Sequence, residues 1–205
     1  MLADMYLREF LDRTSSREAV PGGGSVAALS SALASALTSM VANLTIDKKE
    51  YLEVSEEMLE ISNEMKVRKC EFIQLIDKDA NSFSTVIEAY KLPKNSEKSK
   101  TIRHEAIQDS MKYAAKVPLG IAIDTSKIFG MIKTVVEKGN KNAITDALIA
   151  AMMARTAIKS ALYNVRINLT TIEDEAFVKE VTEQVNELDR FADFKEKEIL
   201  NLVKF

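Results

Sequence analysis

Apolar positions recur at helical spacing along most of the chain, and no run alternates apolar and polar residues long enough to predict a strand. The spacing predicts helices over about residues 3–13, 25–46, 50–91, 100–116, 143–169 and 173–203, with a further helix that ends near 137. Pro118 is expected to break or restart a helix, because proline lacks the backbone N–H. GNKN at 139–142 predicts a turn, with a glycine cap before it and Asn142 as the N-cap of the next helix. We therefore expect one all-α domain over residues 1–205, a bundle of long, mostly antiparallel helices.

Two of the expected helices lack a face suited to water. The helix at 25–46 places six apolar side chains on one face and only Ala and Ser on the other; the apolar six are Val26, Leu29, Leu33, Leu37, Met40 and Leu44. The helix at 143–169 is apolar nearly all round. Helices of this kind are buried between layers or between subunits. We therefore expect a homodimer or a larger assembly.

An uncharged stretch of 28 residues, from Ala19 to Ile46, is long enough to span a bilayer. It consists mostly of Ala and Ser, and Thr and Asn recur through it, so its hydropathy is weak for a membrane span. We favour a buried helix over a membrane span and expect no membrane association.

Charge and cysteine content exclude several classes of function. The net charge of −3 and pI of about 5.4 argue against a nucleic-acid partner. Cys70 and His104 are the only residues of their types. A single cysteine cannot form an internal disulfide, and the N-terminal residues do not resemble a signal peptide, so we expect a cytoplasmic protein. One His and one Cys without a ligand motif predict no metal site.

Three consecutive glycines, Gly22, Gly23 and Gly24, stand before the uncharged helix and make up half of the six glycines in the chain. A phosphate loop is excluded, since no strand precedes them and no Lys-Ser/Thr follows. Two interpretations stay open. The glycines could form a flexible joint with Ser25 as the N-cap, or a bare helix mouth that receives an anion or an electron-rich ligand edge.

Asp79 falls on the apolar stripe of the long helix at 50–91, as does Arg68. A charge in such a position is paired, hydrogen-bonded or functional, because its desolvation is otherwise costly. Asp79 is therefore either a core carboxylate paired with an arginine of another helix or an acid whose pKa is raised by burial. His104 lies in a charged segment and is expected on the surface.

Several longer stretches together resemble the formiminotetrahydrofolate cyclodeaminase / methenyltetrahydrofolate cyclohydrolase family. They run over nearly the whole chain: FLDRTSSREAVPGGGSVAAL, MVANLTIDKKEY, LIDKDANSF, LPKN, AAKVPL, GNKNAITDA and NVRINL. PGGGSVAAL and NVRINL are specific as a pair. Thr145, within AITDA, departs from the family, in which Ser is more common. The resemblance implies an all-α fold, a dimer or larger assembly, no metal, no permanently bound cofactor, and a tetrahydrofolate derivative as the substrate.

The resemblance also implies a reaction that needs no protein nucleophile. In cyclodeamination the substrate's own N10 attacks the formimino carbon held on N5, so positioning supplies much of the acceleration. The enzyme must supply a proton donor for the departing nitrogen, a hold on the pterin and positive charge for the glutamate tail. The acid and the pterin-holding carboxylate are assigned to Asp79 and Asp146, in either order. Substrate binding is assigned to the residues Gly22, Gly23, Gly24, Ser25, Lys48, Lys49, Asn164 and Asn168, while Arg155 is either a tail contact or a structural partner of an acid.

The expected function is conversion of 5-formimino-tetrahydrofolate to 5,10-methenyl-tetrahydrofolate with release of ammonia. The substrate could carry a polyglutamate tail. An alternative within the family is methenyltetrahydrofolate cyclohydrolase, which interconverts the 5,10-methenyl and 10-formyl forms. A helical scaffold without catalysis is the alternative of another class; it predicts ordinary solvated helix faces and no convergence of Gly22–Ser25, Asp79 and Asn164.

Overall fold

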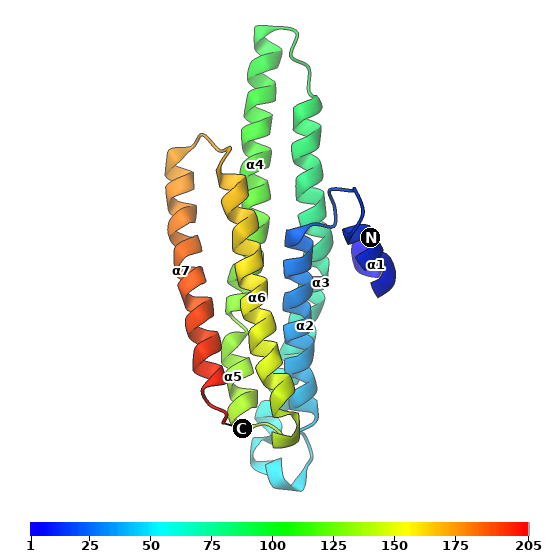
Figure 1. Cartoon of the computed structure of the whole chain (residues 1–205), viewed down its shortest axis with the longest axis vertical. Coiled ribbons are helices and arrows are strands. Elements are labelled where there is room, and N and C mark those ends of the chain that lie inside the picture. The colour runs from blue at the N-terminus through cyan, green and yellow to red at the C-terminus, as the bar shows by residue number, and fades with distance from the viewer. Residues whose placement is uncertain (205) are drawn as a thin grey trace.

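The computed structural model describes residues 1–204, in which long helices run up and down beside one another and no strand occurs (Figure 1). This confirms the all-α bundle predicted from the spacing. The helices are η1 (Leu2–Asp4), α1 (Leu7–Thr14), α2 (Gly23–Asn43), η2 (Lys49–Val54), α3 (Ser55–Lys91), α4 (Glu97–Ser126), α5 (Phe129–Lys138), η3 (Lys141–Ala143), α6 (Ile144–Leu169) and α7 (Glu175–Leu200).

Helix α2 packs between α3 and α6 through its small residues. Its Ala and Ser side chains on this side are buried, and the hydroxyl of Ser31 lies 2.6 Å from that of Thr125 on α4. Small side chains let neighbouring helices approach closely. The buried hydroxyl groups form their hydrogen bonds inside the bundle rather than with water. By length and composition α2 could cross a membrane, with a mean hydropathy of 1.5, and 67% of that segment is buried in the bundle. A core helix passes the same test.

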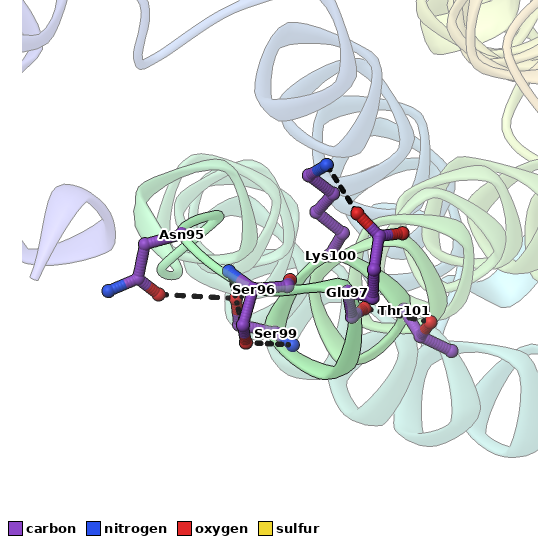
Figure 2. A network of polar contacts seen from close by, with 6 residues as sticks. All are labelled: Asn95, Ser96, Glu97, Ser99, Lys100 and Thr101. Atoms are coloured by element: carbon purple, nitrogen blue, oxygen red, sulfur yellow. Dashed lines mark hydrogen bonds and ion pairs between the residues drawn. The ribbon is translucent and has the colours of Figure 1, made fainter.

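Helices α3 and α4 form a hairpin that extends beyond the ends of α2, α6 and α7 (Figure 1). A capping box begins α4: the Ser96 hydroxyl accepts from the backbone N–H of Ser99 at 3.2 Å, and the Ser99 hydroxyl accepts from the backbone N–H of Ser96 at 2.9 Å (Figure 2). Lys100 pairs with Glu97 at 2.7 Å in the same turn. These bonds satisfy N–H groups that have no partner within the helix.

Pro118 does not break its helix, contrary to the prediction. Helix α4 runs without interruption from Glu97 to Ser126, with Pro118 buried inside it. The missing N–H leaves the carbonyl of Ala114, four residues earlier, without its usual helical donor. The side chain of Asn168 on α6 donates to that carbonyl at 2.7 Å. A tertiary hydrogen bond therefore replaces the local one.

The turn at 139–142 is present, and Gly139 ends α5 as predicted. The predicted N-cap Asn142 was the wrong residue. Asn140 caps η3, since its side-chain oxygen accepts from the N–H of Asn142 at 3.0 Å. The buried Asn140 amide also donates to the carbonyl of Leu44 at 2.8 Å. This bond links the end of α2 to the segment that begins α6.

Candidate active site

The side chains of Ser25 and Asp79 link the first turn of α2 to α3. The Ser25 hydroxyl lies 3.1 Å from Asp79 Oδ2 and 3.0 Å from the backbone carbonyl of Ile76. Ser25 was predicted as an N-cap, but Gly22 holds that position and Ser25 lies within the first turn. Because α2 begins two residues earlier than expected, the fully buried Ser25 side chain points at α3.

Two of the three glycines are required by close approach of another helix. A methyl group on Gly24 would overlap the Asp79 carboxylate, and one on Gly23 would lie 3.0 Å from Asn164 Nδ2. Neither glycine has a positive φ, so backbone strain is not the reason for them. The glycines let the carboxylate of α3 and the amide of α6 reach the first turn of α2.

Asp79 has a raised pKa because burial disfavours its charged form. Hydrogen bonds from the Ser25 side chain and backbone act in the opposite direction and only partly offset the desolvation. No arginine of another helix pairs with Asp79 among the described residues. Of the two interpretations of Asp79, the structure favours a carboxylic acid that holds its proton more tightly than usual.

Asn164 and Asn168 on α6 present amide side chains beside this carboxyl. Asn164 Nδ2 donates to the carbonyl of Ser160 at 2.8 Å, and Asn168 Nδ2 donates to that of Ala114 at 2.7 Å. These bonds fix the orientation of the two amide groups. The Oδ1 atoms remain as acceptors for N–H groups of a ligand.

Asp79, the three glycines and the two asparagines line a single cavity of about 150 Å³. Helices α2, α3, α4 and α6 and the segment before α2 all contribute to it. The residues that sequence reasoning did not assign to it are Ala19, Val20, Ser82, Phe83, Val86, Met111 and Ala114. Phe83 could have been found, because it follows Asp79 by four residues on the same apolar stripe.

The single chain does not bring the other predicted residues to this cavity. Asp146 is 18 residues before Asn164 on α6, about 27 Å away along the helix axis. Lys48 and Lys49 follow the far end of α2 and are exposed. Their assignment to the substrate site stays a prediction.

The other charged residues considered from sequence have structural partners. Arg68 pairs with Glu64 at 2.7 Å and with Glu71 at 3.0 Å. Arg155 pairs with Asp193 of α7 at 2.8 Å, so it is a structural partner of an acid rather than a contact of the cavity. His104 is exposed at 3.2 Å from Glu173.

The fold and the cavity define an all-α protein with a protonatable carboxyl group facing glycine backbone and amide acceptors. The chain belongs to the formiminotransferase-cyclodeaminase family, whose model matches residues 6–187. This confirms the resemblance drawn from PGGGSVAAL and NVRINL.

Relatives with different names cover most of the chain. A methenyltetrahydrofolate cyclohydrolase of Methylorubrum extorquens is 37% identical over 180 residues, which is 88% of this chain and 86% of the relative. Formimidoyltransferase-cyclodeaminase of Mus musculus is 32% identical over 187 residues, 91% of this chain, but the chain spans only 35% of that protein's length. The crystal structure of formiminotetrahydrofolate cyclodeaminase from Thermotoga maritima superposes with a TM-score of 0.86 at 32% identity, covering 97% of this chain and 96% of that one.

Proposed function

We propose that the protein is a folate one-carbon enzyme that converts 5-formimino-tetrahydrofolate to 5,10-methenyl-tetrahydrofolate and ammonia. The observation that carries the proposal is Asp79, an acid of raised pKa that lines a cavity with bare glycine backbone and two oriented amides. Family membership and the similarity to the Thermotoga maritima cyclodeaminase support the choice of substrate class.

The reaction forms the N10–carbon bond and breaks the bond from that carbon to the formimino nitrogen. The nitrogen leaves as ammonia after it has gained two protons, one from N10 and one from an acid. We assign the acid role to Asp79, because burial raises the pKa of its carboxyl group, which therefore keeps a proton to donate at a higher pH than an ordinary aspartate does. The carboxylate that remains is stabilised by the Ser25 hydroxyl at 3.1 Å.

The rest of the cavity serves to hold the reacting end of the folate. Gly23 and Gly24 let the Asp79 carboxylate and the Asn164 amide reach the wall of the cavity, where a pterin can contact both groups. The Oδ1 atoms of Asn164 and Asn168 accept hydrogen bonds from pterin N–H groups. A cavity of about 150 Å³ takes the pterin end only, so the p-aminobenzoyl group and the glutamate tail extend outside it. The half-exposed ring of Phe83 offers an apolar edge on that path.

Methenyltetrahydrofolate cyclohydrolase activity is the second candidate. It is favoured by the 37% identical relative of that name, which aligns along 86% of its length. Both reactions pass through a tetrahedral carbon bridging N5 and N10, and they differ in whether ammonia leaves or water attacks. The same acid and the same pterin contacts serve either reaction.

Two substrates distinguish the candidates from each other and from a scaffold without catalysis. Absorbance of the methenyl chromophore is followed with 5-formimino- and with 5,10-methenyl-tetrahydrofolate, and ammonia is measured in parallel. Chromophore formation with ammonia release is the expected result. Decay of the methenyl substrate alone would assign the cyclohydrolase, and turnover of neither would leave the scaffold interpretation.

The proposal extends to the setting of the enzyme. A single cysteine is compatible with the reducing cytoplasm, where we place the protein. We propose a homodimer or larger assembly without a permanently bound cofactor, acting on folates that include polyglutamylated forms. Light scattering measures the assembly, and KM for mono- and polyglutamylated substrate measures any recognition of the tail.

A further inference from the structure

The α3–α4 hairpin continues past the cavity without α2 or α6 beside it (Figure 1). The cavity lies where α2 begins, at Gly22–Gly24, and where α6 ends, at Asn164 and Asn168. A ligand that is too long for the cavity therefore emerges beside the projecting part of the hairpin. The face of the hairpin that lines the cavity is the surface that such a ligand meets next.

On α3, the side chains that line the cavity belong to a stripe that runs on towards the tip of the hairpin. Phe83 and Val86 line the cavity, and Tyr90 follows them by seven and four residues. Residues at this spacing share one face of a helix. Phe83 and Tyr90 are 41% and 47% exposed, so their rings are open to a ligand.

A matching stripe on α4 ends at Arg103. Met111 lines the cavity, and Ile107 and Arg103 precede it by four and eight residues on the same face. The guanidinium carbon of Arg103 lies 5.5 Å from the centre of the Tyr90 ring, and Nε and Nη2 donate to the Tyr90 carbonyl at 3.3 and 3.1 Å. The two stripes thus meet in one surface, the hairpin strip, which consists of Phe83, Val86, Tyr90, Ile107 and Arg103.

The Arg103 guanidinium is available to an anion. Arg103 forms no ion pair within residues 1–204, although its neighbour Lys100 pairs with Glu97 at 2.7 Å. Of the five N–H groups of a guanidinium, only two donate to the Tyr90 carbonyl. The groups that remain can form the paired hydrogen bonds with which arginine binds a carboxylate. The apolar strip therefore ends at an ordered cation.

Positive charge gathers at the tip of the hairpin, although the chain as a whole carries a net charge of −3. Residues 91–103 contain five basic side chains and one acidic side chain, and the acidic one, Glu97, is paired with Lys100 (Figure 2). Lys94 and Lys98 are exposed. Clustered charge of one sign attracts a ligand of the opposite sign and raises its rate of association. The tip thus favours an anion with more than one carboxylate.

We propose that the hairpin strip binds the part of the folate that does not fit in the cavity. The p-aminobenzoyl ring lies against Phe83 and Tyr90, and the first glutamate pairs with Arg103. Further glutamates of a polyglutamate tail extend to Lys94 and Lys98. This inference rests on the proposed function, which identifies the ligand as a folate.

The order of groups along the strip matches the order of groups in the ligand. Tyr90 follows Asp79 by eleven residues, about 16 Å along the axis of α3. An extended p-aminobenzoyl-glutamate spans most of this distance, so a reacting carbon beside Asp79 sets the first glutamate near Arg103. The aromatic ring of the ligand then lies beside the exposed rings of the strip, and its carboxylates lie beside the cations. Lys48 and Lys49 follow the opposite end of α2 and lie off this route.

Binding measurements with two ligands of different length test the strip without reference to turnover. Titration calorimetry gives Kd for 5-methyl-tetrahydrofolate, which has one glutamate, and for 6-methyl-tetrahydropterin, which lacks the p-aminobenzoyl-glutamate. Arg103→Ala should raise Kd for the folate by about 10–100-fold, the effect of a lost charged hydrogen bond, and leave Kd for the pterin unchanged. Arg103→Lys should recover part of the loss, because lysine keeps the charge without the paired geometry. Arg190→Ala, an exposed arginine on α7, is the matched control and should change neither Kd.

The two ligands separate a docking role from a structural one. A structural defect in Arg103→Ala would weaken both ligands alike. That result, or an unchanged Kd for the folate, would overturn the role of Arg103, as would a wild-type protein that binds the folate no more tightly than the pterin. A wild-type protein that binds neither ligand would refute the proposed function, and the docking site would fall with it.

A polyglutamyl form of the same folate tests the tip. It should bind the wild-type protein about tenfold more tightly than the monoglutamate, and added salt should weaken this preference. Lys94→Ala combined with Lys98→Ala should remove most of the preference and leave Kd for the monoglutamate unchanged. Absence of any preference in the wild-type protein, or a preference that is lost with Lys48→Ala and Lys49→Ala instead, would overturn the tip as the site of the tail.

Discussion

The side-chain amide of Asn168 donates a 2.7 Å hydrogen bond to the backbone carbonyl of Ala114, the group left without a helical donor by Pro118. A cavity-lining residue of α6 thus supplies the hydrogen bond that the proline removes from α4. The bond fixes the orientation of the Asn168 amide, because its nitrogen faces Ala114 and its oxygen is left for a ligand. The proline therefore has a role in positioning a candidate binding group.

Removal of the Asn168 side chain should destabilise the protein through this carbonyl. Asn168→Ala leaves the carbonyl without its partner, and we expect a loss of about 1–3 kcal/mol in the free energy of unfolding. Pro118→Ala supplies the missing N–H, so Asn168→Ala should cost about 1 kcal/mol less in that background. Urea unfolding of the four proteins of this cycle measures the coupling. Equal costs in both backgrounds would mean that Asn168 contributes to stability in some other way.

Asp79→Asn should separate catalysis from stability. Loss of the proton donor is expected to reduce turnover by about 10²–10⁴-fold. The folded protein should become more stable at neutral pH, because burial raises the pKa of Asp79 and its ionised form opposes folding. This gain should be absent below the unfolded pKa of about 4, where Asp79 is protonated in both states, and should grow as pH rises through the folded pKa.

Turnover and thermal melts across pH 4–8 test both halves of this prediction. Asp109→Asn, an exposed aspartate on α4, is the matched control and should change neither quantity. Near-normal turnover of Asp79→Asn would return this residue to a structural role.

Ser25→Ala should shift the pH dependence of turnover. The hydrogen bonds from Ser25 lower the pKa of Asp79 against the larger effect of burial, so removal of the hydroxyl raises that pKa further. A general acid acts in its protonated form, and the decline of kcat at high pH should therefore move to higher pH. Ser30→Ala is the control, since its hydroxyl bonds to the Val26 carbonyl at 3.0 Å on the same helix. If Ser25→Ala left the pH profile of kcat unchanged, the group that titrates in this profile would not be Asp79.

Gly24→Ala should be far more damaging than another glycine substitution of the same kind. A methyl group at Gly24 overlaps the Asp79 carboxylate, so the acid must move out of position, and we expect at least a 10²-fold loss of kcat/KM. Gly120→Ala is the control, because nothing lies within 4 Å of the added methyl in the middle of α4. It should retain activity and gain about 0.5–1 kcal/mol of stability. Steady-state kinetics and thermal melts compare the two variants.

Periodicity was sufficient to predict an all-α bundle and the unusual position of Asp79. The apolar stripe of α3 identified a carboxyl group on a buried face, and the glycines marked the place where another element approaches closely. The fate of Pro118 could not be predicted in the same way, since the donor that satisfies Ala114 is supplied by α6, 54 residues later in the chain. The capping role of Asn140 was missed for a related reason, because its amide also bonds to Leu44 across the bundle.

The sequence was least informative about which of the predicted site residues lie together at the cavity. A helical pattern specifies the direction in which Asp146 and Asn164 project from α6, and that direction is the same for both. Their relation to Asp79 depends on which end of α6 lies beside the first turn of α2, which is set by chain topology. The antiparallel neighbours α2 and α6 bring Asn164 to Gly23 and leave Asp146 at the other end.

The cavity is lined by segments from the beginning, the middle and the end of the chain: 19–24, 79–86, 111–114 and 164–168. In an unfolded chain these segments are far apart, so a ligand that fills the cavity binds the folded state alone. Thermodynamic linkage then converts occupancy into resistance to heat, by about 2.7 kcal/mol when the ligand is at 100 times its Kd. Thermal melting with a folate that cannot react would thus measure affinity in the inactive Asp79→Asn protein, where no turnover assay can.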